Sequence, residues 1–145
     1  MKTRHIILAG ALLAAPPAFA AVAQQAAADR LPPESTQGTV HYVSGGIGRD
    51  ESMAFRNAEH RYPLALEFAV KAKPRDEYTA GVKVQIRDAK GHTVLDTVSD
   101  GPFLLAQLPQ GRYEIRATQA GKTLERHADV VDRKPRHVGF VWPAQ

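Results

Sequence analysis

The feature that most constrains this chain is a two-residue alternation of apolar and polar side chains that begins after Pro63. In 64–70 the leucine, phenylalanine and valine side chains at even positions alternate with Ala65, Glu67 and Ala69. The segments 82–87 and 113–117 alternate in the same way. This period is typical of strands with one buried face. The chain must therefore pair several strands and cover their apolar side with a second layer.

Turn residues separate these segments at intervals of eight to twelve residues. The turns expected are Asp88-Ala89-Lys90-Gly91, with Gly91 at positive φ, Leu108-Pro109-Gln110-Gly111 and Ala120-Gly121. Seven or so short strands at this spacing predict an all-β fold: a single antiparallel β-sandwich, with its body over 63–145.

A small cap is expected before the body, over 39–62. Thr39–Val43 predicts a short strand, Ser44–Gly48 a glycine-rich turn, and Asp50 the N-cap of a helix that runs to about His60. The helix has one apolar face at three- and four-residue steps. Its residues are Ile47, Ala54, Phe55, Ala58 and Tyr62.

The first 23 residues have the layout of a secretory signal. Lys2 and Arg4 precede the short apolar stretch 6–15, and small-x-small motifs predict cleavage near residues 20–23. The apolar stretch is shorter than the roughly 20 residues that cross a bilayer, and no later stretch is long enough. Residues 24–38 are expected to form a flexible leader. The sequence therefore predicts a periplasmic or secreted protein with no membrane span.

Charge and cysteine content further limit what can stabilise the fold and what the protein can bind. The 145 residues contain no cysteine, so no disulfide supports the fold and the core must do so. Loss of Lys2 and Arg4 with the signal lowers the net charge from +4 to about +2. A surplus this small, spread along the chain, argues against a nucleic-acid partner. No cofactor is expected.

The segment Gly81–Gly91, followed by Thr97, Asp100-Gly101, Phe103 and Leu108–Tyr113, resembles carboxypeptidase regulatory-like domains. The likeness spans roughly residues 81–141. Residues 44–68 also resemble a group of small proteobacterial periplasmic proteins that has no established activity. The resemblance implies a prealbumin-like (transthyretin-like) fold, a periplasmic location and a non-catalytic accessory role.

No segment carries the pattern of a catalytic or phosphate-binding site. Gly45-Gly46-Ile47-Gly48 could cradle an anion, but Arg49-Asp50-Glu51 follows in place of the Lys-Ser/Thr pair of a phosphate loop. Ser44 sits beside Gly45 but lacks the glycine two residues before it that a nucleophile elbow requires. A structural turn is therefore favoured, and a hydrolase of unrecognised type remains an alternative.

The mature histidines lack zinc-motif spacing, so no metal site is expected. If the last two strands form a hairpin around 132–135, His127 and His137 become cross-strand neighbours and offer two weak ligands. Exposed, unliganded histidines are the favoured interpretation. An isopeptide bond between Lys83 and Asp129 is a further, less favoured alternative.

A carbohydrate-binding module is the most specific alternative function. Sugar sites stack aromatic faces on sugar rings, and the candidate rings are Tyr42, Tyr62, Tyr78 and Trp142. Trp142 shares its side of the last strand with Val138, which favours core packing.

The sequence predicts a non-catalytic module that binds a protein or glycan partner in the cell envelope. Loops on a rigid sandwich often carry binding residues, and here they are the glycine-rich turn and the turn at 100–102. The predicted interaction surface consists of Gly45, Gly46, Gly48, Asp50, Glu51, Asp100 and Gly101.

Signal processing can be measured directly. We expect the protein recovered from a periplasmic extract to lack residues 1–20 or 1–23, because both sites present small residues to the peptidase. Intact-mass measurement and N-terminal sequencing give the new terminus. Recovery of the uncut precursor in the cytosol would contradict export.

Overall fold

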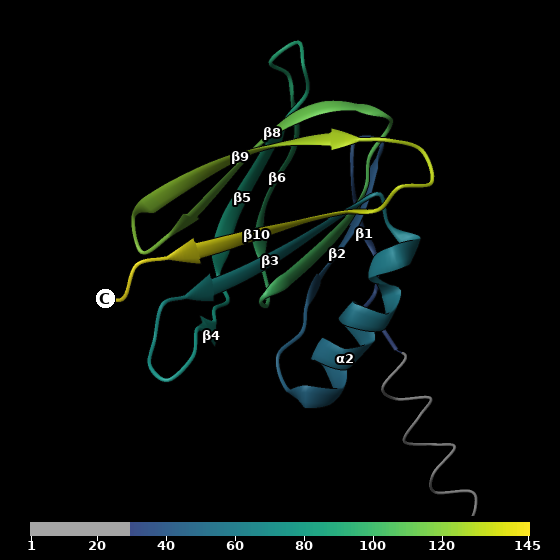
Figure 1. Cartoon of the computed structure of the whole chain (residues 1–145). Helices are drawn as coiled ribbons and strands as arrows, with labels where there is room; N and C mark the ends of the chain where they lie inside the picture. Colours follow the sequence, from purple (N-terminus) through teal and green to yellow (C-terminus); the bar gives the residue numbers. More distant parts are fainter. Residues whose placement is uncertain (1–29) are drawn as a thin grey trace, which may run out of the picture.

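The computed structural model describes residues 30–145, which form two facing sheets and one helix (Figure 1). Sheet A has the strand order β1 (Ser35–Gln37), β2 (Val40–Gly45), β7 (Phe103–Gln107), β3 (Leu64–Val70) and β10 (Arg136–Trp142), and β4 (Glu77–Tyr78) pairs with the end of β3. Sheet B has the order β6 (Thr93–Ser99), β5 (Val82–Arg87), β8 (Gly111–Gln119) and β9 (Lys122–Val130). The prediction of a β-rich, two-layer fold is confirmed.

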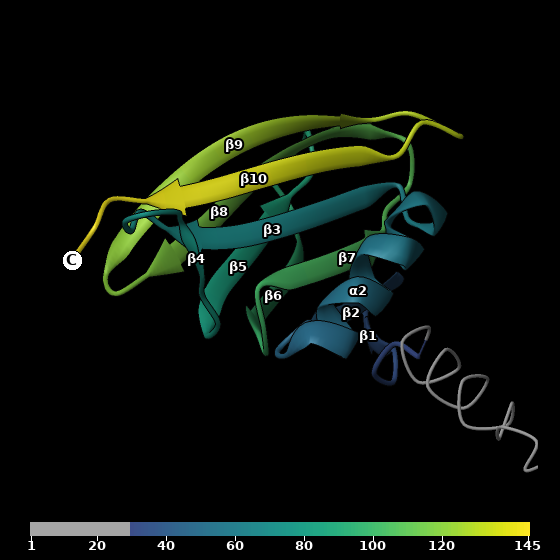
Figure 2. The same cartoon turned by 60° about the horizontal axis from the view of Figure 1, so that its bottom comes forward.

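A helix packs on the outer face of sheet A, as Figure 2 shows. This helix, α2 (Arg49–Ala58), continues into a 3-10 turn, η1 (Glu59–Arg61). Its N-cap is Gly48, at φ 85°, and not Asp50 as predicted. Glycine adopts this left-handed conformation without strain. Asp50 and Glu51 lie in the first helical turn, where negative charge is favourable to the helix dipole.

The central strands of sheet A are buried on both faces, which corrects the expectation of a half-buried strand at 64–70. Leu66 and Phe68 face sheet B, and Ala65 packs in a second core under α2 with Phe55 and Leu105. The small Ala65 side chain leaves room for the helix. The molecule therefore has three layers here: sheet B, sheet A and helix.

The sandwich was predicted to be antiparallel throughout, but it contains one parallel strand pair. β10 pairs in parallel with β3, and β9 belongs to sheet B, so the last two strands do not form a hairpin. Residues 131–135 form a tight crossing between the sheets, with Arg133 at φ 58° and the Lys134 N–H bonded to the Val131 carbonyl. The crossing directs Val138 and Trp142 into the main core.

The N-terminal segment is more ordered than predicted. Residues 35–37, assigned to a flexible leader over 24–38, form strand β1 on β2, and Gly38 turns between them at φ 59°. A three-residue edge strand with exposed side chains has no apolar period to detect. The predicted signal at 1–23 and residues 24–29 lie outside the described residues. Within 30–145, no helix has the length and apolar character needed to span a membrane.

A side chain joins the edges of the two sheets. The Gln37 amide donates to the Asp96 carbonyl at 3.0 Å, and the Asp96 N–H donates to Gln37 Oε1 at 2.6 Å. Gln37 thus supplies the donor and the acceptor that a neighbouring strand would offer to β6. Beside it, the Tyr42 hydroxyl lies 3.2 Å from Thr97 Oγ1.

Replacement of Gln37 should loosen this edge. We expect Gln37→Ala to lower the free energy of unfolding by about 1–2 kcal/mol, because two hydrogen bonds are lost at an exposed position. Gln110→Ala, at an exposed turn position with no hydrogen bond described, is the matched control and should be neutral. Urea unfolding of both variants measures the difference, and equal stability would refute the role given to Gln37.

Candidate functional site

The predicted interaction residues gather where β2 ends and the β6–β7 turn passes beneath it. A Cβ on Gly101 would lie 2.2 Å from the Gly45 carbonyl oxygen, and a Cβ on Gly46 would lie 2.4 Å from the Phe103 ring. The two backbones therefore touch because these positions carry no side chain. We call Gly45, Gly46 and Gly101 the glycine junction.

Hydrogen bonds from polar side chains stabilise the glycine junction. Glu51 Oε1 accepts from the Gly46 N–H at 2.7 Å. Ser44 Oγ accepts from the Asp100 N–H at 3.1 Å. Ser99, which is fully buried, has its Oγ 2.7 Å from the Gly101 carbonyl oxygen. Sequence reasoning missed Ser99, although a serine before Asp100-Gly101-Pro102 is a usual turn residue.

The predicted surface is thus partly internal. All three glycines of the junction are buried, whereas Gly48, Asp50 and Asp100 are exposed. The glycines position the start of α2 and cannot contact a partner themselves. The direct role of these glycines is the close packing of two chain segments.

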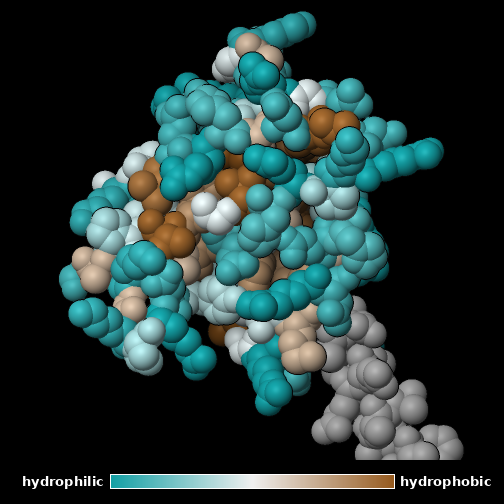
Figure 3. Space-filling view, viewed as in Figure 1, coloured by the Kyte–Doolittle hydropathy of each residue, from teal (hydrophilic) through white to brown (hydrophobic). Residues whose placement is uncertain are grey.

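Exposed apolar side chains surround this junction. Ile47 is 65% exposed, Tyr78 46% and Met53 44%. A hollow of about 490 Å³ is lined by Ile47 and Tyr78, together with Ser52, Thr79 and Pro102. On the face seen in Figure 3, apolar residues form small separate patches among hydrophilic ones. We call Ile47 and Tyr78, which line this hollow beside α2, the α2 patch.

Tyr78 is held in place although β4 has only two residues. Its ring lies 5.3 Å from the Phe103 ring, centroid to centroid. The Arg56 guanidinium carbon lies 5.7 Å from the Tyr78 centroid, and its Nη2 donates a hydrogen bond to the Tyr78 hydroxyl. Phe103 in turn stacks on Phe55 at 5.8 Å. The exposed ring is therefore anchored to the core under α2.

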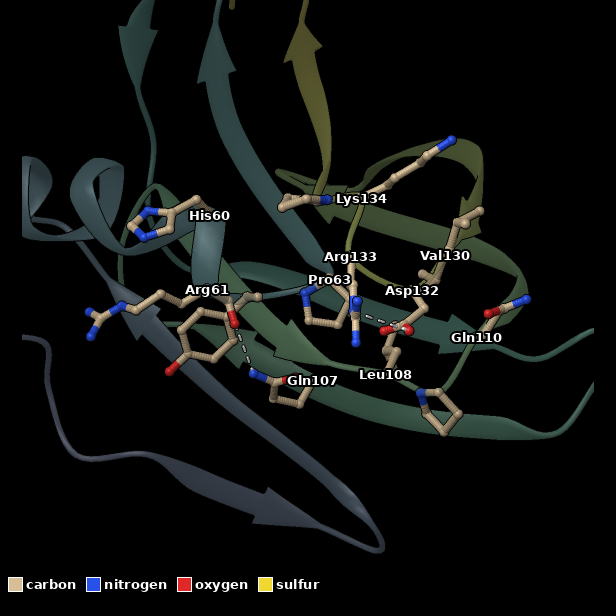
Figure 4. Close-up of a pocket in the computed structure, with 14 residues that line it drawn as sticks. His60, Arg61, Pro63, Gln107, Leu108, Gln110, Val130, Asp132, Arg133 and Lys134 are labelled. Carbon is tan, nitrogen blue, oxygen red and sulfur yellow. Dashed lines mark hydrogen bonds and ion pairs between the residues drawn. The ribbon is translucent and has the colours of Figure 1, made fainter.

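A larger hollow, of about 680 Å³, lies at the other end of α2 (Figure 4). It opens between η1, the β7–β8 turn and the β9–β10 loop, and its polar lining includes Arg61, Gln107 and Arg133. Gln107 Nε2 donates to the Arg61 carbonyl at 3.1 Å. Burial raises the pKa of the Tyr62 hydroxyl at this end, and nearby Glu34 raises it further. Tyr62 therefore stays neutral and donates to Glu34 Oε2 at 3.2 Å.

The two histidines expected as cross-strand neighbours lie on different sheets. His127 is on β9 and has Glu125 at 3.5 Å, whereas His137 is on β10 and contacts Glu59 and Glu67. The pairing prediction is wrong because the chain changes sheets between them. Within residues 30–145, no group of three or more His, Cys, Asp or Glu side chains could hold a metal.

Lys83 and Asp129 are also apart, since β8 separates β5 from β9, and Asp129 pairs with Arg112 at 3.0 Å.

The four candidate sugar-binding rings do not form one platform. Trp142 is 1% exposed, and its Nε1 donates to the Lys122 carbonyl at 2.9 Å. Tyr62 is buried and Tyr42 partly buried. Of the four, Tyr78 alone presents an exposed ring.

No protein-family model matches the chain, and no curated protein matches it. A function can therefore be inferred only from the arrangement of the residues themselves.

The glycine junction can be tested with a matched pair of substitutions. We expect Gly101→Ala to lower the free energy of unfolding by about 1–3 kcal/mol or more, because the new methyl group would meet the Gly45 backbone. Gly139→Ala, on β10 with open space around its Cβ, should leave stability unchanged. Thermal and urea unfolding measure both. A Gly101→Ala variant as stable as Gly139→Ala would show that the two segments do not touch.

Proposed function

We propose that this protein is an exported, non-catalytic, transthyretin-like β-sandwich module that binds a protein partner in the cell envelope through the α2 patch. The observation that carries the proposal is that Ile47 and Tyr78 stay exposed at a hollow, while hydrogen bonds and ring contacts hold the structure beneath them. Exposed apolar groups at a hollow are a common mark of interaction sites.

The fastening favours binding because it lowers the entropy lost on association. The glycine junction sets where Ile47 lies, and Arg56 with Phe103 holds the Tyr78 ring. A partner therefore meets side chains whose positions are already restricted. Tyrosine with a neighbouring arginine is also a frequent combination at the centre of protein interfaces.

A protein partner is favoured over a glycan. Sugar recognition uses broad aromatic faces, and the α2 patch has the single ring of Tyr78 at the same hollow as the aliphatic Ile47. Such a mixture suits an apolar side chain of a partner.

A non-catalytic role is supported by the surroundings of the polar groups described. Ser44, which precedes the glycine junction, has its hydroxyl bonded with Asp100 and not with a histidine. A serine nucleophile needs a base within hydrogen-bond reach. Export is supported by the signal-like layout of residues 1–23, and an accessory role by the resemblance of residues 81–141 to carboxypeptidase regulatory-like domains.

Site-specific photo-crosslinking in cells tests the binding surface. A photoreactive amino acid at position 47 or 78 should give a discrete adduct with one partner. The same group at Val98, exposed on sheet B, should give none. Ile47→Ser with Tyr78→Ser should abolish recovery of that partner, because apolar contact is lost.

Val98→Ser with Val141→Ser is the matched control and should retain the partner. Circular dichroism establishes that both double variants fold. Equal adducts from positions 47, 78 and 98, or undiminished recovery with the first double variant, would remove the α2 patch from the proposal. Turnover of ester, peptide or glycoside substrates by the purified protein would overturn the non-catalytic role.

A further inference from the structure

Three neighbouring hollows meet at the end of the molecule away from the α2 patch. The hollow of about 680 Å³ shares His60 and Pro135 with one of about 300 Å³ beside η1. That one shares Arg136 with a third, of about 440 Å³, at the end of β9. Because these hollows share lining residues around the β9–β10 loop, we treat them as one region and call it the basic groove.

The basic groove carries an excess of positive charge. Its cationic side chains are Arg61, Arg112, Arg133, Lys134 and Arg136, and its acidic side chains are Glu59, Asp129 and Asp132. Arg56 also lines the smallest hollow, but its guanidinium bonds with Tyr78 and is not counted here. Each acidic group is already engaged by a neighbour. Asp129 pairs with Arg112 at 3.0 Å, Asp132 with Arg133 at 3.9 Å, and Glu59 with His137.

Three cations of the groove have no ion pair among residues 30–145: Arg61, Lys134 and Arg136. Cations without an ion pair also occur elsewhere in this part of the chain, such as Lys83 and Lys122 on sheet B. The lining of the groove is distinguished by its surplus of cationic over acidic side chains, which attracts an anionic ligand there.

The arrangement of side chains suits an extended chain and not a single small anion. Figure 4 shows Arg133 pointing into the hollow beside Asp132, whereas Arg61 and Lys134 extend away on two sides. The lining between them includes Pro63 and Leu108, which are apolar. An extended peptide presents its side chains alternately to opposite sides. Such a peptide could place apolar side chains against Pro63 and Leu108, and carboxylates near Arg61 on one side and Lys134 on the other.

We propose that the basic groove binds an extended acidic peptide segment of a partner protein. The site goes beyond the proposed function, since it lies at the opposite end of α2 from the α2 patch and uses charge in place of apolar contact. An acidic polysaccharide is less suited, because Tyr62, the aromatic residue of the largest hollow, is 9% exposed. A membrane surface is less suited, because the cations extend in different directions.

Fluorescence anisotropy with a labelled peptide of alternating glutamate and alanine tests the proposal on the protein purified after export. The peptide should bind at low ionic strength and weaken as salt rises, because screening acts over about 8–10 Å at physiological salt. Arg61→Glu with Lys134→Glu should weaken binding by about tenfold or more, since two attractions become repulsions.

Lys83→Glu with Lys122→Glu changes the net charge equally at exposed sites on sheet B and should leave binding within about twofold. Arg61→Lys with Lys134→Arg keeps both charges and should retain affinity. Unfolding curves verify that all three variants fold. Equal loss in the two charge-reversal variants, or no binding of the glutamate peptide, would overturn the proposal. Preference for heparin or for anionic phospholipid vesicles over the peptide would overturn it as well.

Discussion

The burial of β3 and β7 on both faces is the constraint on which the rest of the structure depends. Sheet B covers one face of these strands and α2 covers the other, so sheet A is the middle of three layers. The helix can dock only because Ala65 is small and because Phe55 reaches between Val43 and Phe103. Since α2 must lie there, the chain needs an abrupt change of direction where β2 ends, and the glycine junction provides it.

Both proposed binding regions follow from the position of this one helix. The turn that leads from the glycine junction into its N-terminus exposes Ile47 at the same hollow as Tyr78. Its last turn passes into η1 and contributes His60 and Arg61 to the basic groove. The two ends differ in chemistry, apolar at the start and cationic at the end. A single rigid element therefore separates two kinds of contact across the length of sheet A.

The sequence predicted what depends on local pattern and missed what depends on long-range contact. Alternation at 64–70 and 82–87 located strands correctly, and Gly91 takes the positive φ expected of it. The parallel partner of β10 was missed, because alternation shows which side chains are buried and says nothing of strand direction. The contact between Gly45 and Gly101 was not foreseen, since it exists only in the folded chain. The basic groove was missed because Arg61 and Arg112 join Arg133, Lys134 and Arg136 only when the chain folds.

The pairing of β3 with β10 also governs when the chain can finish folding. It joins residues 64–70 to 136–142, so one edge of sheet A and the Trp142 side chain are contributed by the last part of the chain. A nascent polypeptide that ends at β9 lacks this strand and leaves Phe68 without its aromatic neighbours Phe140 and Trp142. Long-range parallel pairing is slow to form. Until β10 pairs with β3, the main core therefore lacks one edge strand and the aromatic side chains of Phe140 and Trp142.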